Sequence, residues 1–140
     1  MDRLNEMTTK QAATAYSGLG WRVLPLCPPD HSGVTEHHLA QCHNPGKVPR
    51  LSDWRSQASS DPAVVSSWFE WWENSNLGMV LGSAEGIIAI DVDGEYGRQK
   101  LAELSGGDLP ITLQFSTPGG GLRYLYKPPN GAALRKIKEA

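Results

Sequence analysis

The chain has 140 residues, of which 39% are hydrophobic and 20% are charged, and this composition predicts one compact domain with a hydrophobic core. Its formal net charge of −2 gives no overall attraction to nucleic acid, although a local basic patch is not excluded. No apolar run approaches the length of about 20 residues that spans a bilayer, and residues 1–10 lack the apolar segment of a signal peptide. We therefore expect a cytoplasmic protein without a membrane partner.

The chain opens with a pattern typical of a helix followed by a strand. A short helix is expected over residues 8–18, with Thr8 or Thr9 as its N-cap. WRVLPL (21–26) predicts a strand, and its proline favours a strand edge or end. Residues 27–53 are rich in proline, histidine and glycine, which predicts a long irregular loop. A loop of this length inside a compact domain is usually functional or held by some added constraint.

Asp61-Pro62 marks the start of a second helix, because an N-cap residue precedes a proline in the first helical position. The helix is expected to run to about Asn74. Apolar residues follow it at helical spacing and predict a buried aromatic stripe. The stripe consists of Val64, Val65, Trp68, Trp71 and Trp72.

The second half of the chain alternates strands with a third helix. LGMVLG (77–82) and GIIAIDV (86–92) predict two strands joined as a hairpin by a short Ser-Ala-Glu turn. A helix is expected over residues 95–104, and two more strands over residues 112–117 and 122–127. This alternation favours an α+β or α/β sheet with helices packed against it.

Two carboxylates follow directly on an apolar strand in GIIAIDVDG. Residues i and i+2 of a strand point to the same face, so Asp91 and Asp93 are expected to project together, with Val92 turned into the core. Neighbouring carboxylates repel each other unless a cation neutralises them, and carboxylate oxygens suit Mg²⁺ or Mn²⁺. Asp93-Gly94 is also ordinary turn chemistry, but the apolar run before the pair favours a metal site.

The sequence TPGGGLRYLY places three glycines between two predicted strands. Glycine lets the backbone approach a ligand closely and exposes N–H groups that suit phosphate oxygens, while a following arginine adds a cation. The alternative is a glycine-rich hairpin turn with ordinary surface charges, and the absence of Gly-Lys-Ser/Thr excludes a Walker loop. The candidate nucleotide-binding residues are Thr117, Gly119, Gly120, Gly121 and Arg123, together with Lys47 from the Asn-Pro-Gly-Lys turn.

Cysteines and histidines are concentrated within residues 27–43. A structural zinc ion takes four soft or borderline ligands in a tetrahedron, and a long loop without a core gains most from such a constraint. Cys27 and His31 have ligand spacing, and Cys42 with His37 or His38 can complete the site; we take Cys27, His31, His38 and Cys42 as the candidate set. The alternative is chance occurrence, since the spacing matches no standard zinc finger.

These stretches, in this order, resemble the bifunctional primase–polymerase (prim-pol) domain of the archaeo-eukaryotic primase superfamily. The resemblance extends from about residue 9 to residue 135. It is carried by GWRVLPL, PGKVP, DPAVVSSWFEWW, NLGMVLG, IDVD and LPITLQFSTPGGG. It implies a single domain over residues 1–140 with an α+β fold, in which a mixed, mainly antiparallel sheet flanked by helices forms an RRM-like derived catalytic core.

The resemblance implies a DNA primase/polymerase in which Asp91 and Asp93 are catalytic and hold two Mg²⁺ or Mn²⁺ ions. Its substrates would be nucleoside triphosphates and a single-stranded or primed DNA template. The parent protein would carry a helicase or other replication module and replicate a plasmid, phage or integrated element. Two departures stand out: Arg123 occupies the place of a family histidine, and the third metal-binding acid is expected after Ala140, so that the chain is a C-terminally truncated fragment.

Two other functions are compatible with the same residues. The first is a non-catalytic module that binds nucleotides or single-stranded DNA, with Arg123 and the missing third acid as signs of lost chemistry. The second is a metal-dependent nuclease or phosphohydrolase that uses Asp91 and Asp93. Template-directed incorporation of nucleotides separates the polymerase from both alternatives.

Overall fold

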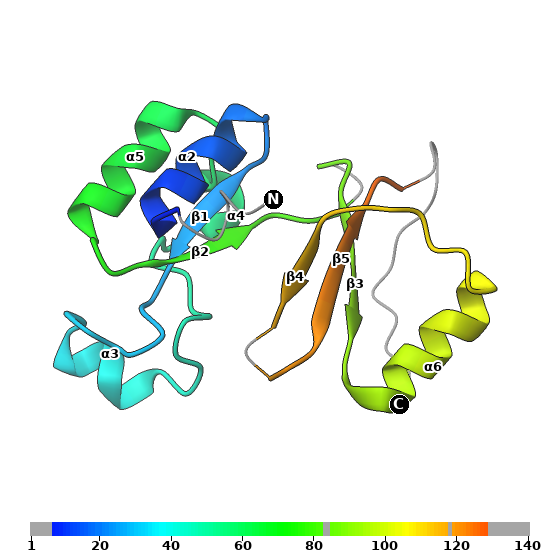
Figure 1. Cartoon of the computed structure of the whole chain (residues 1–140). Coiled ribbons are helices and arrows are strands. Elements are labelled where there is room, and N and C mark those ends of the chain that lie inside the picture. The colour runs from blue at the N-terminus through cyan, green and yellow to red at the C-terminus, as the bar shows by residue number, and fades with distance from the viewer. Residues whose placement is uncertain (1–6, 83–84, 118, 129–140) are drawn as a thin grey trace. The chain divides into compact units, whose positions relative to one another are not determined.

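The computed structural model describes residues 7–82, 85–117 and 119–128 of the chain. They divide into two compact units, unit 1 over Met1–Val80 and unit 2 over Leu81–Ala140 (Figure 1). The predicted α+β class is confirmed, because the described residues form five helices and two small antiparallel sheets. No helix among these residues is long and apolar enough to cross a membrane.

Unit 1 packs two helices against a two-stranded sheet. β1 (Val23–Leu26) pairs antiparallel with β2 (Asn76–Met79), and α2 (Thr9–Gly18) lies beside α5 (Pro62–Trp71) over this pair (Figure 1). Each element buries one face, so the core forms where helices and sheet meet. The buried core residues are Ala13, Val23, Val65 and Phe69.

Both long helices of unit 1 begin where the sequence predicts. Thr8 caps α2 in a capping box, since its side chain accepts from the N–H of Gln11 and the Gln11 side chain accepts from the N–H of Thr8. Asp61 caps α5 by accepting from the N–H of Ala63 at 2.9 Å, with Pro62 in the first turn. These caps are local in sequence, which is why they can be predicted.

The predicted buried stripe on α5 is wrong at two of its five residues, Val64 and Trp71. Val64 is 39% exposed and Trp71 is 82% exposed, whereas Phe69, which the stripe omitted, is 3% exposed and belongs to the core. Val65 and Trp68 do face the core. The helix contacts α2 and β1. Apolar side chains of α5 that do not face these elements, such as Val64 and Trp71, remain exposed to solvent. α5 also ends a few residues earlier than predicted.

The segment between β1 and α5, which the structure describes throughout, contains two short helices, α3 (Glu36–Gln41) and α4 (Trp54–Gln57). The rest of it is irregular. α3 buries none of its residues. The segment is joined to β1 by backbone hydrogen bonds, one of which runs from the N–H of Arg50 to the carbonyl of Pro25 at 3.0 Å.

Unit 2 consists of a three-stranded antiparallel sheet and one helix. β5 (Leu122–Tyr126) lies between β3 (Ile88–Val92) and β4 (Gln114–Ser116), and α6 (Gly94–Ser105) continues directly from β3 (Figure 1). These elements confirm the helix and three strands expected here, with shorter strands than predicted. Among the residues of this unit that the structure describes, the buried apolar ones are Ile87, Val92 and Leu125.

The predicted hairpin between β2 and β3 is wrong. β2 pairs with β1 and β3 pairs with β5, so the two strands belong to different sheets. Among the described residues an isolated bridge between Gly82 and Ile87 is what remains of the hairpin, and two residues of the predicted Ser-Ala-Glu turn lie outside the described part. Gly78 favours the pairing with β1, because a Cβ there would lie 3.2 Å from the side chains of Leu24 and Leu26.

Candidate functional site

Asp91 lies near the end of β3, directly opposite Arg123 of β5. Nε of Arg123 donates to Oδ1 of Asp91 at 2.6 Å and its Nη2 donates to Oδ2 at 2.9 Å, which makes a bidentate ion pair. The side chains of Arg123 and Asp91 are 45% and 47% exposed, so solvent reaches the pair. The hydrogen bond to Asp91 raises the pKa of Arg123, and the guanidinium stays charged. The charge of Asp91 is therefore balanced by a cation of the protein itself.

Asp93 follows directly after β3 and is the N-cap residue of α6. Its backbone is extended, with φ −114° and ψ 124°, and its side chain makes no capping hydrogen bond. Val92 between the two acids is 4% exposed and packs inward, as predicted. Because strand residues alternate between faces, Asp91 and Asp93 share the exposed face.

The glycine turn closes on Asp93. A Cβ at Gly121 would lie 2.4 Å from Oδ1 of Asp93, a separation that no real side chain allows, so this position requires glycine. The hydroxyl of Thr117 accepts from the N–H of Gly121 at 3.0 Å, and the N–H of Gly120 donates to the carbonyl of Thr117 at 3.0 Å. Pro118 lies outside the described residues. The turn thus holds backbone groups directly against one carboxylate of the pair.

The face formed by β3, β5 and the turn offers a defined set of chemical groups. Asp91 and Asp93 supply hard oxygen donors of the kind that Mg²⁺ and Mn²⁺ prefer. A carboxylate has about four lone-pair positions, so the two bonds from Arg123 do not by themselves prevent Asp91 from binding a metal. The guanidinium fits a phosphate group in the same bidentate way as it fits the carboxylate. The donor set therefore fits divalent cations and the phosphates they accompany.

For the other predicted nucleotide-binding residues, the described part of the structure shows no contact with Asp91 or Asp93 as close as that of Gly121. Gly119 is exposed in the turn, and Thr117 uses its hydroxyl within the turn. Lys47 is exposed in a turn of unit 1, where its N–H donates to the carbonyl of Asn44 at 3.1 Å. The acids, the glycines and Arg123 are thus brought together in unit 2, whereas Lys47 belongs to unit 1.

Unit 1 contains a second group of chemically active residues, which we call the Cys/His cluster: Cys27, His31, His38 and Cys42. One possible ligand atom from each residue lies within 4.8 Å of all the others. Both thiols are free, their sulfur atoms are 4.0 Å apart, and Nε2 of His31 lies 3.3 Å from Sγ of Cys42. Residues separated by up to 15 positions in the sequence therefore meet at one point. The arrangement can hold a metal ion.

Cys27 is the most enclosed member of the cluster, at 1% exposed. Burial by itself raises the pKa of its thiol. Hydrogen bonds from the backbone N–H groups of Val48 and Gly46, from the Cys42 side chain and from the N–H of Lys47 act in the opposite direction, and the pKa is lowered. The turn around Gly46 therefore surrounds this sulfur with donors.

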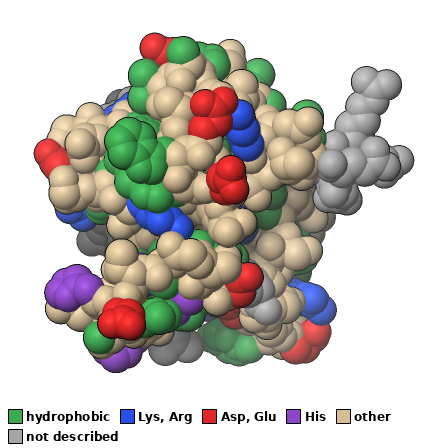
Figure 2. Space-filling view, turned by 90° about the vertical axis from the view of Figure 1, so that its left-hand side faces the viewer, with side chains coloured by type: hydrophobic (Ala, Val, Ile, Leu, Met, Phe, Trp, Pro, Cys, Tyr) green, Lys and Arg blue, Asp and Glu red, His purple; other side chains and the backbone are tan. Residues whose placement is uncertain are grey.

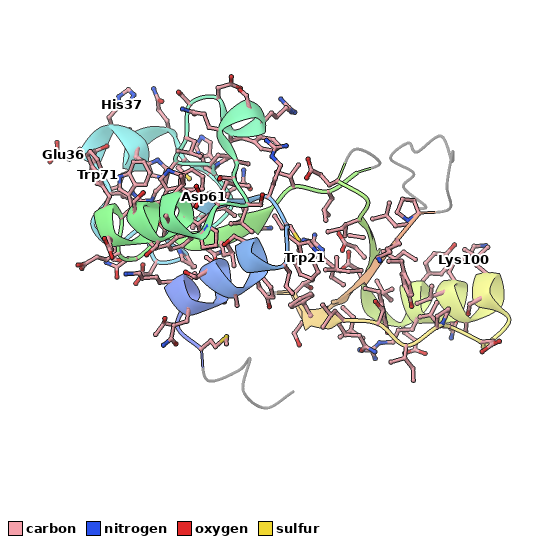
Figure 3. All side chains as sticks on the ribbon, turned by 90° about the horizontal axis from the view of Figure 1, so that it is seen from above. Trp21, Glu36, His37, Asp61, Trp71 and Lys100 are labelled. Carbon is pink, nitrogen blue, oxygen red and sulfur yellow. The ribbon has the colours of Figure 1, made fainter. Side chains whose placement is uncertain are left out.

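The sequence left open whether His37 or His38 belongs with the cysteines, and the structure places His38 there. The Nε2 atom of His38 is buried and has no hydrogen-bond partner. His37 points outward from α3, away from the rest of unit 1 (Figure 3). The histidine side chains seen on the face of Figure 2 gather at its lower edge, where α3 lies in Figure 1.

The ion pair between Asp91 and Arg123 is the one site feature that the sequence reasoning missed. The sequence predicted that Arg123 binds a phosphate. It predicted a turn that joins the strand of Arg123 to the strand over residues 112–117, but no pairing with the strand of Asp91. A register for β3 against β5 that sets Val92 opposite Leu122 brings the two charges face to face. That register depends on a pairing distant in sequence, so no local signal revealed it.

Comparison with known families identifies the chain. The sequence model of the Prim-Pol family, described as bifunctional DNA primase/polymerase, N-terminal, matches residues 12–139. No curated protein and no solved structure matches the chain. The match spans nearly the whole sequence and includes both Asp91 and the glycine turn. The chain therefore belongs to the family of N-terminal domains of bifunctional DNA primases/polymerases.

Proposed function

We propose that this chain carries the catalytic site of a DNA primase/polymerase, in which Asp91 and Asp93 bind two divalent metal ions and Arg123 binds the phosphates of the incoming nucleotide. The reaction would join nucleoside triphosphates to a primer or starting nucleotide on a single-stranded or primed DNA template. Family membership supports the reaction type. The location would be the cytoplasm, and the setting the replication of a plasmid, phage or integrated element, with a helicase or other replication module in the same protein.

The observation that carries the proposal is the convergence of three features on one exposed face. Two acids alternate around a buried valine, a cation lies directly opposite the first acid, and a glycine turn approaches the second to within contact. Phosphoryl transfer needs little covalent chemistry from a protein. It needs groups that position phosphates and metal ions, and these residue types provide them.

Metal ions held by this pair would assist the attack of the 3′-hydroxyl and stabilise negative charge on the phosphates. The carboxylates of Asp91 and Asp93 fix where those ions sit. The glycine turn approaches Asp93 closely, because Gly121 carries no side chain.

Arg123 is proposed to change partners during the reaction. Without ligand it neutralises Asp91. A triphosphate offers several anionic oxygens in place of one carboxylate, so the guanidinium moves to the phosphates and leaves the carboxylate to the metal. This exchange lets an arginine serve where the resemblance leads one to expect a histidine.

The test is template-directed incorporation of labelled nucleotides by the purified protein with Mg²⁺ or Mn²⁺. We expect products whose sequence complements the template, and loss of these products in Asp91→Asn. Asp108→Asn is the matched control, since Asp108 is an exposed acid of the same unit beyond the end of α6. Absence of incorporation with every template and metal, together with intact folding, would overturn the proposal.

A second candidate function is a non-catalytic module that binds nucleotides or single-stranded DNA. The observation that favours it is the bidentate ion pair, because a carboxylate already neutralised by arginine has less need of a metal. Binding of a triphosphate without dependence on Mg²⁺ or Mn²⁺, and without incorporation, would support this module. Binding that requires the metal would support the enzyme.

A further inference from the structure

The Cys/His cluster takes no part in the proposed nucleotide chemistry. We propose that Cys27, His31, His38 and Cys42 bind one Zn²⁺ in a closed tetrahedral site, and that this ion holds the segment between β1 and α5 in its fold. The inference goes beyond the proposed function and uses different residues. Either can therefore fail while the other stands.

The distances within the cluster fit a zinc ion. Bonds of about 2.3 Å to sulfur and about 2.0 Å to nitrogen place neighbouring ligands of a tetrahedron about 3.3–3.8 Å apart. Sγ of Cys27 and Sγ of Cys42 are 4.0 Å apart, Nε2 of His31 is 3.3 Å from Sγ of Cys42, and all four ligand atoms lie within 4.8 Å of one another. Small side-chain rotations bring the wider pairs onto the ion.

His38 supplies an independent indication of a missing partner. Its Nε2 atom is buried and makes no hydrogen bond, although buried polar atoms are nearly always paired. The His31 and His38 rings meet edge to face, with centroids 5.2 Å apart and planes at 87°. Zinc bound to His38 through Nε2 would give this nitrogen its partner.

The segment needs such a constraint because its helix has no core of its own. α3 has six residues and buries none of them, and helices this short are unstable without tertiary packing. Both ends of α3 would be tied, through His38 in its first half and through Cys42 at its C-cap. Cys27 directly after β1 would anchor them to the sheet. One ion therefore replaces the hydrophobic contacts that the helix lacks.

The donor set selects the kind of metal and its role. Two thiols and two imidazoles are ligands for Zn²⁺ and not for Mg²⁺ or Ca²⁺, which prefer oxygen. Four protein ligands leave no position for water or substrate, so the role is structural. A disulfide is the competing chemistry, but its sulfur atoms would have to be about 2.05 Å apart.

The ion would also fix the turn that presents Lys47. The thiol of Cys27 donates to the carbonyl of Asn44 at 3.9 Å, and the side-chain amide of Asn76 donates to the carbonyl of Gly46 at 2.9 Å. A Cβ at Gly46 would lie 3.3 Å from the backbone of Pro29, so the turn is closely fitted as well. Zinc at Cys27 therefore holds the turn from one side while β2 holds it from the other.

Elemental analysis of the purified 140-residue chain tests the proposal. We expect about one mole of zinc per mole of wild-type chain, and at least a tenfold decrease in His38→Ala and Cys42→Ser. His37→Ala is the matched control: it removes a neighbouring histidine of the same helix that points outward, and it should retain the wild-type zinc content. Less than about a tenth of a mole of zinc in the wild-type protein, or equal loss from His37→Ala, would overturn the proposal.

Two further measurements cover the case in which the variants fail to fold. The wild-type chain loaded with Co²⁺ should show the absorption of tetrahedral cobalt with thiolate-to-metal charge transfer. His38→Cys should keep the metal and strengthen the charge-transfer band, because a third thiolate replaces an imidazole. An octahedral cobalt spectrum, or an intact mass that reveals a Cys27–Cys42 disulfide in freshly purified protein, would contradict the zinc site.

Discussion

The two candidate metal sites of this chain differ in whether their possible ligands already have partners within the protein. In unit 2, Asp91 is already neutralised by Arg123, which lies across the sheet and makes two hydrogen bonds to it. In unit 1, four possible ligand residues from a loop and a short helix converge, and the Nε2 atom of one of them, His38, is buried without a hydrogen-bond partner. Asp91 thus has a cationic partner within the protein, whereas the His38 nitrogen has no hydrogen-bond partner.

This difference indicates how each site should behave. A site that the protein can neutralise by itself binds its metal exchangeably, as an enzyme that works through substrate-borne metal ions requires. A site that gathers four protein ligands and leaves one buried nitrogen without a hydrogen bond binds its metal permanently, and the ion becomes part of the fold. We therefore expect loss of metal to impair catalysis in unit 2 and folding in unit 1.

The largest expected effect is that of removing zinc from unit 1. A structural zinc ion contributes several kcal/mol or more to folding, so a strong chelator should lower the melting temperature of unit 1 by about 10 °C or more. Circular dichroism and calorimetry with and without chelator measure the shift. An unchanged melting curve after verified metal removal would show that the cluster does not stabilise the fold.

Next in size is the effect of Asp91→Asn on nucleotide incorporation. Loss of one carboxylate ligand removes several kcal/mol of charge stabilisation, so kcat should fall by about 100-fold to 1000-fold. The melting temperature should change little, because the side chain is 47% exposed. Retention of most of the activity would remove Asp91 from the catalytic site.

A smaller effect is expected for Gly121→Ala. The added Cβ would lie 2.4 Å from Oδ1 of Asp93, so the turn or the carboxylate must move, at a loss of stability of about 1–3 kcal/mol. Denaturant unfolding measures the change. Gly119→Ala is the matched control in the same turn, since nothing lies within 4 Å of a Cβ there. Equal unfolding free energies for the two variants would contradict the close approach of the turn to Asp93.

The smallest effect distinguishes the two roles of Arg123. Arg123→Gln removes the cation that competes for Asp91, so the affinity for Mn²⁺ in the absence of nucleotide should rise several-fold, while the KM for the triphosphate also rises. Titration calorimetry measures the first change and steady-state kinetics the second. Arg98→Gln, an exposed arginine of α6, should alter neither quantity. An unchanged Mn²⁺ affinity in Arg123→Gln would show that Arg123 does not compete with the metal for Asp91.

The sequence predicted well what depends on neighbours along the chain. The caps at Thr8 and Asp61 and the burial of Val92 between two exposed acids follow from local rules. The proximity of the cysteines and histidines was also expected from their spacing. Family resemblance then supplied a function that spacing alone did not give, and the family assignment is confirmed.

What the sequence did not predict depends on partners distant along the chain. The hairpin expected between β2 and β3 fails because β2 pairs with β1, where Gly78 lets the leucines of β1 pack over it. Phe69 is buried and Trp71 is exposed because α2 and β1 determine which face of α5 meets the core. His38 and His37 differ by one position on a helix, and only the placement of that helix decides between them.

The most direct test of the account is a crystal structure of the chain soaked with Mn²⁺ and a nucleoside triphosphate, with anomalous scattering recorded at the manganese and zinc edges. The account predicts manganese beside Asp91 and Asp93 with Arg123 on the phosphates, and zinc among Cys27, His31, His38 and Cys42. Manganese absent from the acid pair, with Arg123 still bound to Asp91 and the triphosphate elsewhere, would contradict it.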